Sequence, residues 1–392
     1  MMDESDLQLS CCETLESIEM LKQEWQQLHQ QCTYPSIYNS YDFIYTAIKY
    51  FCTPSDEIFV IAIRNNRQNG QLVGVFPFLI SDYQWHHAKF RAVVYAGLNE
   101  ADKMYPIILK DVEKSAWPKL FQFLKLQKKR WQFFELVEVR KDFHARKAIK
   151  KYFPSGYLKK RNEDVYSPIV DLTETWEVFW NKHRKMRKRV RKMENDFGEA
   201  FSFKVYAEPE AAMTHLDEYI QLEQRSWKAS EKVGISKSQN NLEFYREFFA
   251  QLAEKNRLYF GFLYQGERLV SAEIAYTLGH TVYFSHGCYD LEFRHYSPGM
   301  VSTSLFLKNF FNVGYKNGDF LGGFAYYINP WAKTLLSSDN LIVAKITPTI
   351  VLVYLASLLK RITWTPMLSL LKKTKHKLLI NSQKLIDKNV KH

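Results

Sequence analysis

The sequence is poor in the residues that mark several classes of protein. Its 392 residues include 5 Cys, 15 Gly and 12 Pro, which excludes a disulfide-rich or collagen-like chain. The number of cysteines is odd and no CxxC pair occurs, so we expect neither a disulfide framework nor a thiolate zinc site. The 11 His residues are scattered without ligand spacing, and we therefore predict no metal.

The chain also lacks an apolar run that could cross a bilayer. The best candidate, residues 341–359, is interrupted by Lys345 and Pro348, whereas a membrane helix needs roughly 20 apolar residues. The N-terminus, MMDESDLQLS, is acidic and polar, unlike a secretory signal. Together with the cysteine usage, these features predict a cytoplasmic protein, at most peripheral on the inner membrane face.

The composition is that of a folded globular protein. Hydrophobic residues make up 46% and charged residues 24% of the chain, and the length favours two domains. The formal charge of +12 is concentrated in two segments, residues 182–192 and 341–392. A partner carrying phosphate groups would engage these segments rather than the whole surface. Nucleic acid is disfavoured because no aromatic residues are interleaved with the basic run at 182–192.

Hydrophobic periodicity predicts a similar order of elements in each half. In the first half we expect helices over 13–30, from Ser40 to Phe51 and over 112–129, with strands over 57–64, 71–80, 89–96 and 131–139. In the second half we expect helices over 174–195, 208–230, 240–255 and 299–314, and strands over 201–206, 281–289, 319–321 and on both sides of Gln265-Gly266. The shared order, with QLVGVFPF (71–78) matching RLVSAEIA (268–275), indicates a tandem duplication.

The predicted class is therefore α/β, with a mixed sheet flanked by helices. We expect modules over 1–165 and 166–334 and a basic helical tail over 335–392. Within the tail, LSLLKKTKHKLLI (368–380) alternates leucines with lysines as membrane-surface helices do, so residues 341–380 are predicted to dock on an anionic membrane surface. The alternative is that 341–359 pack on the body and the remainder is a solvated tail.

Four segments of the second half occur in an order known from one family. They are EQRSWKASEKVGI (223–235), FYREFFAQLAEKNRLYFGFLYQGERLVSAEIAY (244–276), YSPGM (296–300) and GYKNGDFLGGFAYYINPWA (314–332). In this order they resemble the GNAT-like acyltransferases of the cellulose-biosynthesis CelD type, which are related to the FemAB peptidyltransferases. The likeness covers about residues 175–333, and Ile328 stands where the family has Lys.

This resemblance implies tandem acyl-CoA N-acyltransferase (GNAT-like) modules. The second module has Glu273 where the first has Phe76, which indicates that the second holds the chemistry. The resemblance also implies acetyl-CoA or another acyl-CoA as co-substrate. The implied acceptor is an amine or hydroxyl of a small-molecule or lipid-linked precursor of the cell envelope or of a polysaccharide. Two alternatives stay open: an aminoacyl-tRNA-dependent ligase of the Fem type, and a non-catalytic module that binds membrane or nucleic acid through its basic segments.

The resemblance places the coenzyme A pyrophosphate at the loop around YSPGM. Pro298 suits a first helical position, Gly299 lets a ligand approach the backbone, and free amides at a helix start attract phosphate. An ordinary capped loop is the alternative. The residues assigned to cofactor binding are Arg294, Tyr296, Ser297, Gly299 and Met300.

Glu273 is the candidate general base because it is a carboxylate within an apolar strand, and burial raises the pKa of such a group. The first half has Phe76 at the equivalent position. Alternation predicts one face made of Val270, Ala272, Ile274 and Tyr276 and another made of Leu269, Ser271, Glu273 and Ala275. The alternative for Glu273 is an ion pair with Lys or Arg. His286 is the alternative base, and Tyr289 could protonate the departing thiolate.

The acceptor groove is assigned from the family likeness. Glu223 and Trp227 are four residues apart, so we expect them on one helical face with Lys228 beside them. Asp319 and Tyr327 belong to the segment that matches the family's ending. A buried structural role is the alternative for Trp227, and a capping role for Asp319.

Overall fold

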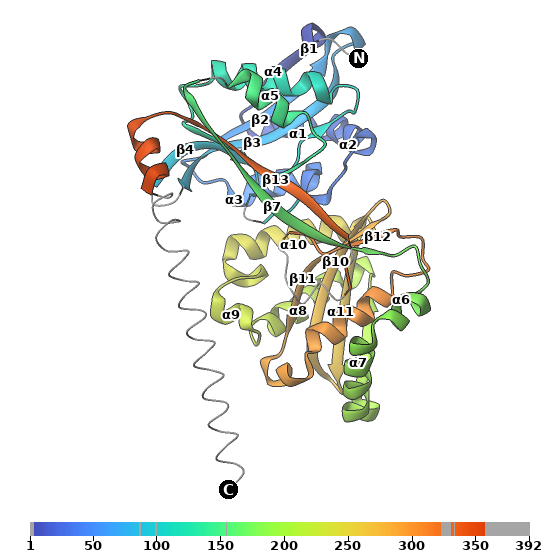
Figure 1. Ribbon diagram of the computed structural model, residues 1–392. Helices are drawn as coiled ribbons and strands as arrows, with labels where there is room; N and C mark the ends of the chain where they lie inside the picture. Colours follow the sequence, from blue (N-terminus) through green and yellow to red (C-terminus); the bar gives the residue numbers. More distant parts are fainter. Residues whose placement is uncertain are drawn as a thin grey trace.

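The computed structural model describes residues 4–85, 88–98, 100–153, 155–322, 331–332 and 334–356 (Figure 1). Within these residues the strands form one continuous mixed sheet, covered by helices on both faces. The predicted class is therefore confirmed. No helix in the described ranges is long and apolar enough to cross a membrane.

The first half contains six strands and five α-helices in its described residues. In chain order they are β1 (Leu7–Cys12), α1 (Leu15–Glu19), α2 (Lys22–Gln31), α3 (Tyr41–Phe51), β2 (Glu57–Asn65), β3 (Gln71–Trp85), β4 (Ala88–Tyr95), β5 (Ile107–Ile108), α4 (Glu113–Leu126), β6 (Phe133–Arg140) and α5 (Ala145–Tyr152). The Ser40 side chain caps α3, as predicted, by accepting a hydrogen bond from the Phe43 amide at 3.3 Å.

The second half begins with a long strand that the sequence pattern did not reveal. Its elements are β7 (Tyr157–Asp171), α6 (Trp176–Lys182), α7 (Arg184–Phe197), β8 (Phe201–Tyr206), α8 (Ala212–Glu223), α9 (Trp227–Glu231), α10 (Gln239–Glu254), β9 (Leu258–Gln265), β10 (Arg268–Leu278), β11 (Thr281–Tyr289), the 3-10 helix η7 (Leu291–Tyr296), α11 (Pro298–Lys308), β12 (Asn317–Asp319) and β13 (Thr334–Lys345).

Strand pairing shows that the two halves repeat one topology. β1, β2, β3 and β4 pair antiparallel in sequence order, and β4 then pairs parallel with β6. In the same way β8, β9, β10 and β11 pair antiparallel, and β11 pairs parallel with β12. A helix lies between the parallel partners in each half, α4 in the first and α11 in the second. The repeat is thus present in the hydrogen-bond pattern of the sheet.

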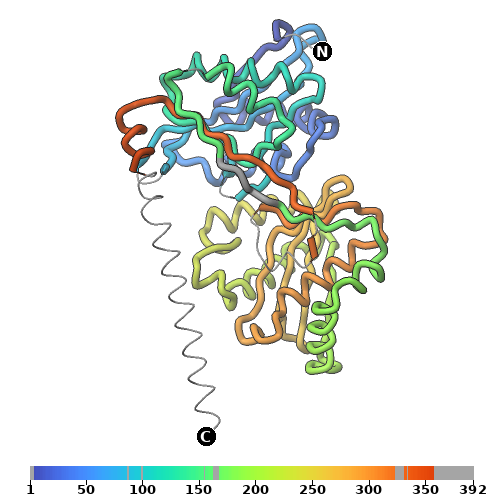
Figure 2. The backbone as a smooth tube through the Cα atoms, viewed as in Figure 1, coloured from blue at the N-terminus to red at the C-terminus, as the bar shows by residue number. Residues whose placement is uncertain are grey.

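Two long strands cross between the halves and join them. The sheet order is β1-β2-β3-β4-β6-β13-β7-β12-β11-β10-β9-β8. β7 follows the first half but pairs with β12 of the second, whereas β13 follows the second half and pairs with β6 of the first. β7 and β13 also pair with each other from Tyr157–Lys345 to Ile169–Thr334 (Figures 1 and 2). The paired strands β7 and β13 therefore lie between the two halves and link them into one sheet.

Helix packing joins the halves a second time. One apolar core contains side chains of α1, α2 and α3 together with those of α8 and α10. The Phe43 ring on α3 makes edge contacts with Phe244 and Phe248 on α10, at centroid distances of 5.5 and 5.3 Å. Opposite this core, α4 and α5 cover the first half, and α6, α7 and α11 cover the second. The relative position of the halves is thus held by buried apolar area.

Several sequence expectations need correction. The helix predicted over 174–195 is broken at His183 into α6 and α7. The helix predicted over 208–230 is also interrupted, because Ser226 caps a new helix, α9, by accepting from the Lys228 amide at 3.2 Å. The prediction of a helical tail that begins at residue 335 is also wrong. Residues 334–345 form β13, and only the segment after it, from 348 to 356, is helical in the described chain.

Candidate active site

Glu273 lies in the middle of β10, between two antiparallel partners. It is directly opposite Gly261 of β9 and Gly287 of β11. A Cβ atom at Gly287 would lie 2.6 Å from Glu273 Oε2, so the glycine leaves the space that the carboxylate occupies. A bulge near Leu269 alters the predicted faces: Leu269 joins the core that contains Ala272, whereas Val270 packs with Val301 of α11. The orientation of Glu273, away from Ala272, is as predicted.

Hydroxyl groups, and not a cation, hold the Glu273 carboxylate. Ser302 Oγ donates to Glu273 Oε1 at 2.9 Å and Thr303 Oγ1 donates to the same oxygen at 2.8 Å. No ion pair to Glu273 is formed in the described part of the chain. Burial raises the pKa of Glu273 to about 7, although both hydroxyls and the charge of Lys228 act in the opposite direction. A carboxyl with this pKa can accept a proton near neutral pH.

In the first half, an aromatic residue occupies the position equivalent to Glu273. Phe76 of β3 is fully buried and makes an edge contact with Trp117 of α4 at 5.1 Å. Trp117 is the fifth residue of α4, as Ser302 is of α11. The aromatic pair Phe76–Trp117 of the first half thus corresponds to the carboxylate–hydroxyl pair Glu273–Ser302 of the second. This asymmetry is what a chemical role confined to the second half would require.

The predicted cofactor loop lies next to this carboxylate. Ser297 has φ 56°, Pro298 is the first residue of α11, and Ser302 and Thr303 follow one turn later. Both hydroxyls also lie within hydrogen-bonding distance of the Gly299 carbonyl, at 3.1 and 2.7 Å. The loop and Glu273 are therefore connected through Gly299 and the first turn of α11.

Tyr289 approaches the same loop from the end of β11. A Cβ atom added at Gly299 would lie 3.4 Å from the Tyr289 ring. Met300 contacts Arg189 of α7, and the Tyr296 ring packs on Phe197 at a centroid distance of 5.3 Å. Arg294 is exposed on η7. The structure thus gathers Glu273, Tyr289 and the predicted cofactor-binding residues around the start of α11.

His286 is on the other face of the sheet. Its Nε2 lies 3.2 Å from Tyr245 Oη of α10, and its Nδ1 lies 2.9 Å from Ser285 Oγ. Tyr245 in turn donates to Glu100 at 2.9 Å. Burial and the charges of Lys228 and Lys237 hold the pKa of His286 well below its usual value, so the ring is neutral. His286 and Glu273 are therefore separate candidates for the base, and not a pair.

Glu223 has a set of protein partners around both carboxylate oxygens. It is 1% exposed and accepts from the Ile235 amide at 3.1 Å and from the Ser236 amide at 2.9 Å. Lys228 Nζ lies 3.6 Å away, and Gly234, with φ 107°, leaves no room for a Cβ beside the carboxylate. Trp227 starts α9 and is half-buried, so the predicted common helical face with Glu223 is wrong. These contacts indicate that Glu223 fixes the turn before α10.

Glu223→Ala is accordingly expected to destabilise the fold rather than weaken a substrate complex. The change leaves two backbone amides without their acceptor, and each buried unpaired group costs about 1–3 kcal/mol. We expect the free energy of unfolding in urea to fall by about 3 kcal/mol. Glu223→Gln, which keeps one acceptor oxygen, should lose less. A stable Glu223→Ala protein would contradict the structural role.

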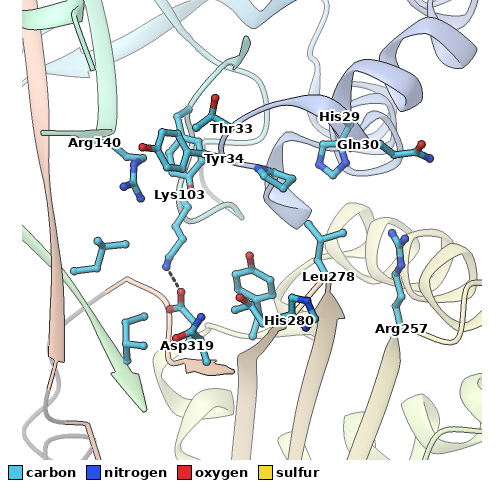
Figure 3. A pocket seen from close by; sticks show the side chains of 18 of the residues that line it. His29, Gln30, Thr33, Tyr34, Lys103, Arg140, Arg257, Leu278, His280 and Asp319 are labelled. Atoms are coloured by element: carbon cyan, nitrogen blue, oxygen red, sulfur yellow. Dashed lines mark hydrogen bonds and ion pairs between the residues drawn. The ribbon is translucent and has the colours of Figure 1, made fainter. Parts of the chain in front are cut away.

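Asp319 lines a cavity between the halves, at the other end of β10 and β11 (Figure 3). The cavity has a volume of about 700 Å³ and receives side chains from both halves. Asp319 is 3% exposed and forms a buried ion pair with Lys103. Other lining residues that carry or can acquire positive charge are His29, Arg140, Arg257 and His280. The predicted residue Tyr327 lies outside the described residues.

The backbone around the Lys103–Asp319 pair is held in an unusual conformation. Lys103, Glu138 and Leu321 have φ of 53°, 53° and 62°, in the left-handed region that non-glycine residues seldom adopt. The Lys103 amide donates to the Glu138 carboxylate, and the Leu321 amide donates to Asp319 Oδ1 at 2.9 Å. Backbone strain of this kind is concentrated at functional sites. Hydrogen bonds within each half therefore fix this backbone, and the Lys103–Asp319 ion pair joins the two halves at the cavity wall.

Sequence reasoning missed Ser302, Thr303 and Lys103. The run Ser302-Thr303-Ser304 within an otherwise apolar helix was a usable signal, because consecutive hydroxyls inside a helix need partners. Lys103 gave no signal, since its partner is 216 residues away in the sequence. In the described residues no group of three His, Cys, Asp or Glu side chains is arranged to hold a metal ion.

Comparison with protein families supports an acyltransferase fold in the second half. Residues 181–327 match the family described as an acetyltransferase (GNAT) domain. This confirms the predicted GNAT likeness for that segment, while the narrower likeness to the CelD type stays a prediction. No curated protein matches the chain.

Solved structures resemble this fold over most of its length. FemX matches with a TM-score of 0.55 and 11% identity, over 84% of this chain and 97% of its own. A conserved protein of unknown function from Bacteroides thetaiotaomicron matches with a TM-score of 0.53 and 12% identity, over 86% and 100%. The C-terminal domain of a lysylphosphatidylglycerol synthetase from Agrobacterium fabrum matches with a TM-score of 0.53 and 10% identity, over 88% and 97%. At these identities the likeness shows the fold alone.

Proposed function

We propose that the second half transfers an acyl group from acetyl-CoA or another acyl-CoA to an amine or hydroxyl of a cell-envelope or polysaccharide-type precursor. The observation that carries the proposal is the Glu273 carboxylate, which lies beside the cofactor loop in the half that matches an acetyltransferase domain. The first half has an aromatic pair in its place and serves as a structural and acceptor-binding partner.

The proposed step is a direct transfer. Glu273 accepts a proton from the attacking amine or hydroxyl, whose lone pair then forms a bond to the thioester carbonyl carbon. The carbon–sulfur bond breaks as the tetrahedral intermediate collapses, and coenzyme A leaves as a thiolate. We assign the protonation of that thiolate to Tyr289, at the end of β11. The products are the acylated acceptor and coenzyme A.

Direct titration tests the proposal. Isothermal calorimetry with acetyl-CoA and with longer acyl-CoAs would show whether a thioester binds and which chain length is preferred. Incubation of the bound thioester with an amino sugar, followed by mass spectrometry, would detect transfer. Absence of binding to every acyl-CoA would refute the proposal.

We propose that the cavity between the halves holds a part of the acceptor remote from its reacting amine or hydroxyl, because the cavity lies at the far end of β10 and β11 from Glu273. The cavity volume of about 700 Å³ is within the range for sites that hold a small organic ligand. Arg140, whose guanidinium lies 3.7 Å from the centre of the Tyr34 ring, and Arg257 supply charge for an anionic group. Asp319, predicted from the sequence as an acceptor-binding residue, is part of its wall.

Membrane docking is proposed for the segment after β13. Ile346, Val351, Leu352 and Leu355 are exposed large apolar side chains close together in the sequence. The leucine–lysine stretch at 368–380 lies outside the described residues. Insertion of such apolar side chains among anionic headgroups would place the acyltransferase beside a lipid-linked acceptor.

Gly299→Val is expected to weaken coenzyme A binding while leaving the fold intact. A Cβ at this position meets only the Tyr289 ring, at an ordinary contact distance of 3.4 Å, so the added side chain can be accommodated. It would occupy the space through which a phosphate approaches the backbone. We expect the Kd to rise about tenfold or more, equivalent to about 1.4 kcal/mol. Gly299→Ala should have a smaller effect, and an unchanged Kd in a folded Gly299→Val protein would refute this loop as the pyrophosphate site.

A further inference from the structure

Helix α7 has an apolar side and a strongly basic remainder. Met186, Val190, Met193 and Phe197 are buried at helical spacing and pack against β9, β10 and α11. Exposed cations occupy much of the remaining helix surface. Two rows of them differ by one residue in register. The first row is Lys185, Arg189 and Lys192, and the second is Arg184, Lys188 and Arg191. Because spacings of four and three residues return to the same side of a helix, each set forms one row.

Only the first row faces the cofactor loop. Arg189 Nη1 lies 2.7 Å from Met300 Sδ, and Lys192 Nζ lies 4.7 Å from the centre of the Tyr296 ring. Both loop residues belong to the segment assigned above to the cofactor. The second row is rotated about 100° around the helix axis and points away from the loop. One helix thus carries two similar sets of charges, of which one adjoins the candidate site.

Protein carboxylates leave most of this charge uncompensated. Lys192 forms an ion pair with Asp196, whereas neither Lys185 nor Arg189 has a carboxylate partner in the described chain. Arg294 and His295 are exposed on η7, and the His295 ring lies 4.1 Å from that of Tyr296. Cations gathered on two elements beside one loop create a positive potential that attracts a multiply charged anion.

We propose that the row Lys185–Arg189–Lys192 binds the phosphates at the adenosine end of coenzyme A. This inference rests on the proposed function, because it takes the loop at Ser297–Met300 as the pyrophosphate site. Coenzyme A carries a 3′-phosphate in addition to its diphosphate, and the row supplies charges for a phosphate beyond the reach of the backbone amides. Arginine and lysine side chains bind phosphate through charge-assisted hydrogen bonds. The row therefore selects the 3′-phosphorylated cofactor over its dephosphorylated form.

The two rows permit a matched experiment on the full chain. The double variant Arg189→Gln/Lys192→Gln removes two charges from the first row, and Arg184→Gln/Lys188→Gln removes two charges from the second. Calorimetric titrations would use coenzyme A, dephospho-coenzyme A and adenosine 3′,5′-bisphosphate at one ionic strength. We expect the first variant to bind coenzyme A at least tenfold more weakly and to lose the preference over dephospho-coenzyme A. The second variant should retain both.

The remaining outcomes separate this inference from the proposed function. Equal losses in the two variants would show a general attraction between a basic helix and any polyanion, and would overturn the inference. If coenzyme A binding depends on Gly299 but not on the first row, the function stands and the inference fails. If adenosine 3′,5′-bisphosphate binds through the first row and no thioester is turned over, the phosphate site stands and the acyltransferase proposal fails.

Discussion

Glu273→Gln is expected to lower kcat by about 10²–10⁴-fold, the usual contribution of a general base. The amide keeps the shape of the side chain and can still accept from Ser302 and Thr303, so the fold should persist. What is lost is the group that takes the proton of the attacking amine or hydroxyl. The measurement is acceptor-dependent release of thiol from the acyl-CoA that binds, with Kd determined separately to show that binding is unaffected.

The pH dependence provides a second readout of the same residue. Because the base must be ionised and burial raises the pKa of Glu273 to about 7, kcat/KM of the wild type should rise with pH and level off above about 7. Thr303→Val removes one of the hydroxyls that lower this pKa, so the midpoint should move upward. A Glu273→Gln enzyme with activity near that of the wild type would show that His286 or water is the base.

Ending the chain after Thr334 is expected to prevent folding altogether. This removes nearly all of β13, which pairs with β6 on one side and β7 on the other. Its residues Leu341, Ile342, Val343 and Ala344 are at most 5% exposed. Burial of each large aliphatic side chain stabilises the fold by about 1.5–3 kcal/mol, and the total is comparable to the stability of a whole domain. The expected result is insoluble protein or one without a cooperative thermal transition.

A chain that ends at Ala356 is the matched control. It retains β13 and should unfold cooperatively and bind coenzyme A with the wild-type Kd. The same protein tests membrane docking, because sedimentation with anionic vesicles at low salt should be lost if the segment beyond 356 supplies the lysines. A folded protein ending at Thr334 would contradict the central position of β13.

The elements that were predicted well are those whose sequence is apolar throughout or at alternate positions. The hairpin around Gln265-Gly266 and the strand at 201–206 follow this pattern, since one or both faces are covered by helices. β7 does not, because its sequence from Lys159 to Asp164 is polar without interruption. Its backbone is nonetheless paired with β13 over its length. Main-chain hydrogen bonds to a distant strand leave no periodic signal in the sequence.

The candidate site was predictable only in part, for a similar reason. Glu273 could be recognised because a carboxylate in an apolar strand needs an explanation. Its partners Ser302 and Thr303 lie about 30 residues further along, and their role depends on how α11 crosses β10. The cavity between the halves could not be predicted at all, because Lys103 and Asp319 are 216 residues apart and meet only when the two halves pack together.

The pairing of β13 with β6 also constrains the order in which the protein can fold during synthesis. β6 ends at Arg140, yet its second neighbour does not begin until Thr334, so the first half emerges from the ribosome with one central strand edge unpaired. Pairing across such a sequence separation is slow, and an open strand edge invites association with other chains. Completion of the sheet must therefore await the last strand, and the two halves reach their final form together rather than one after the other.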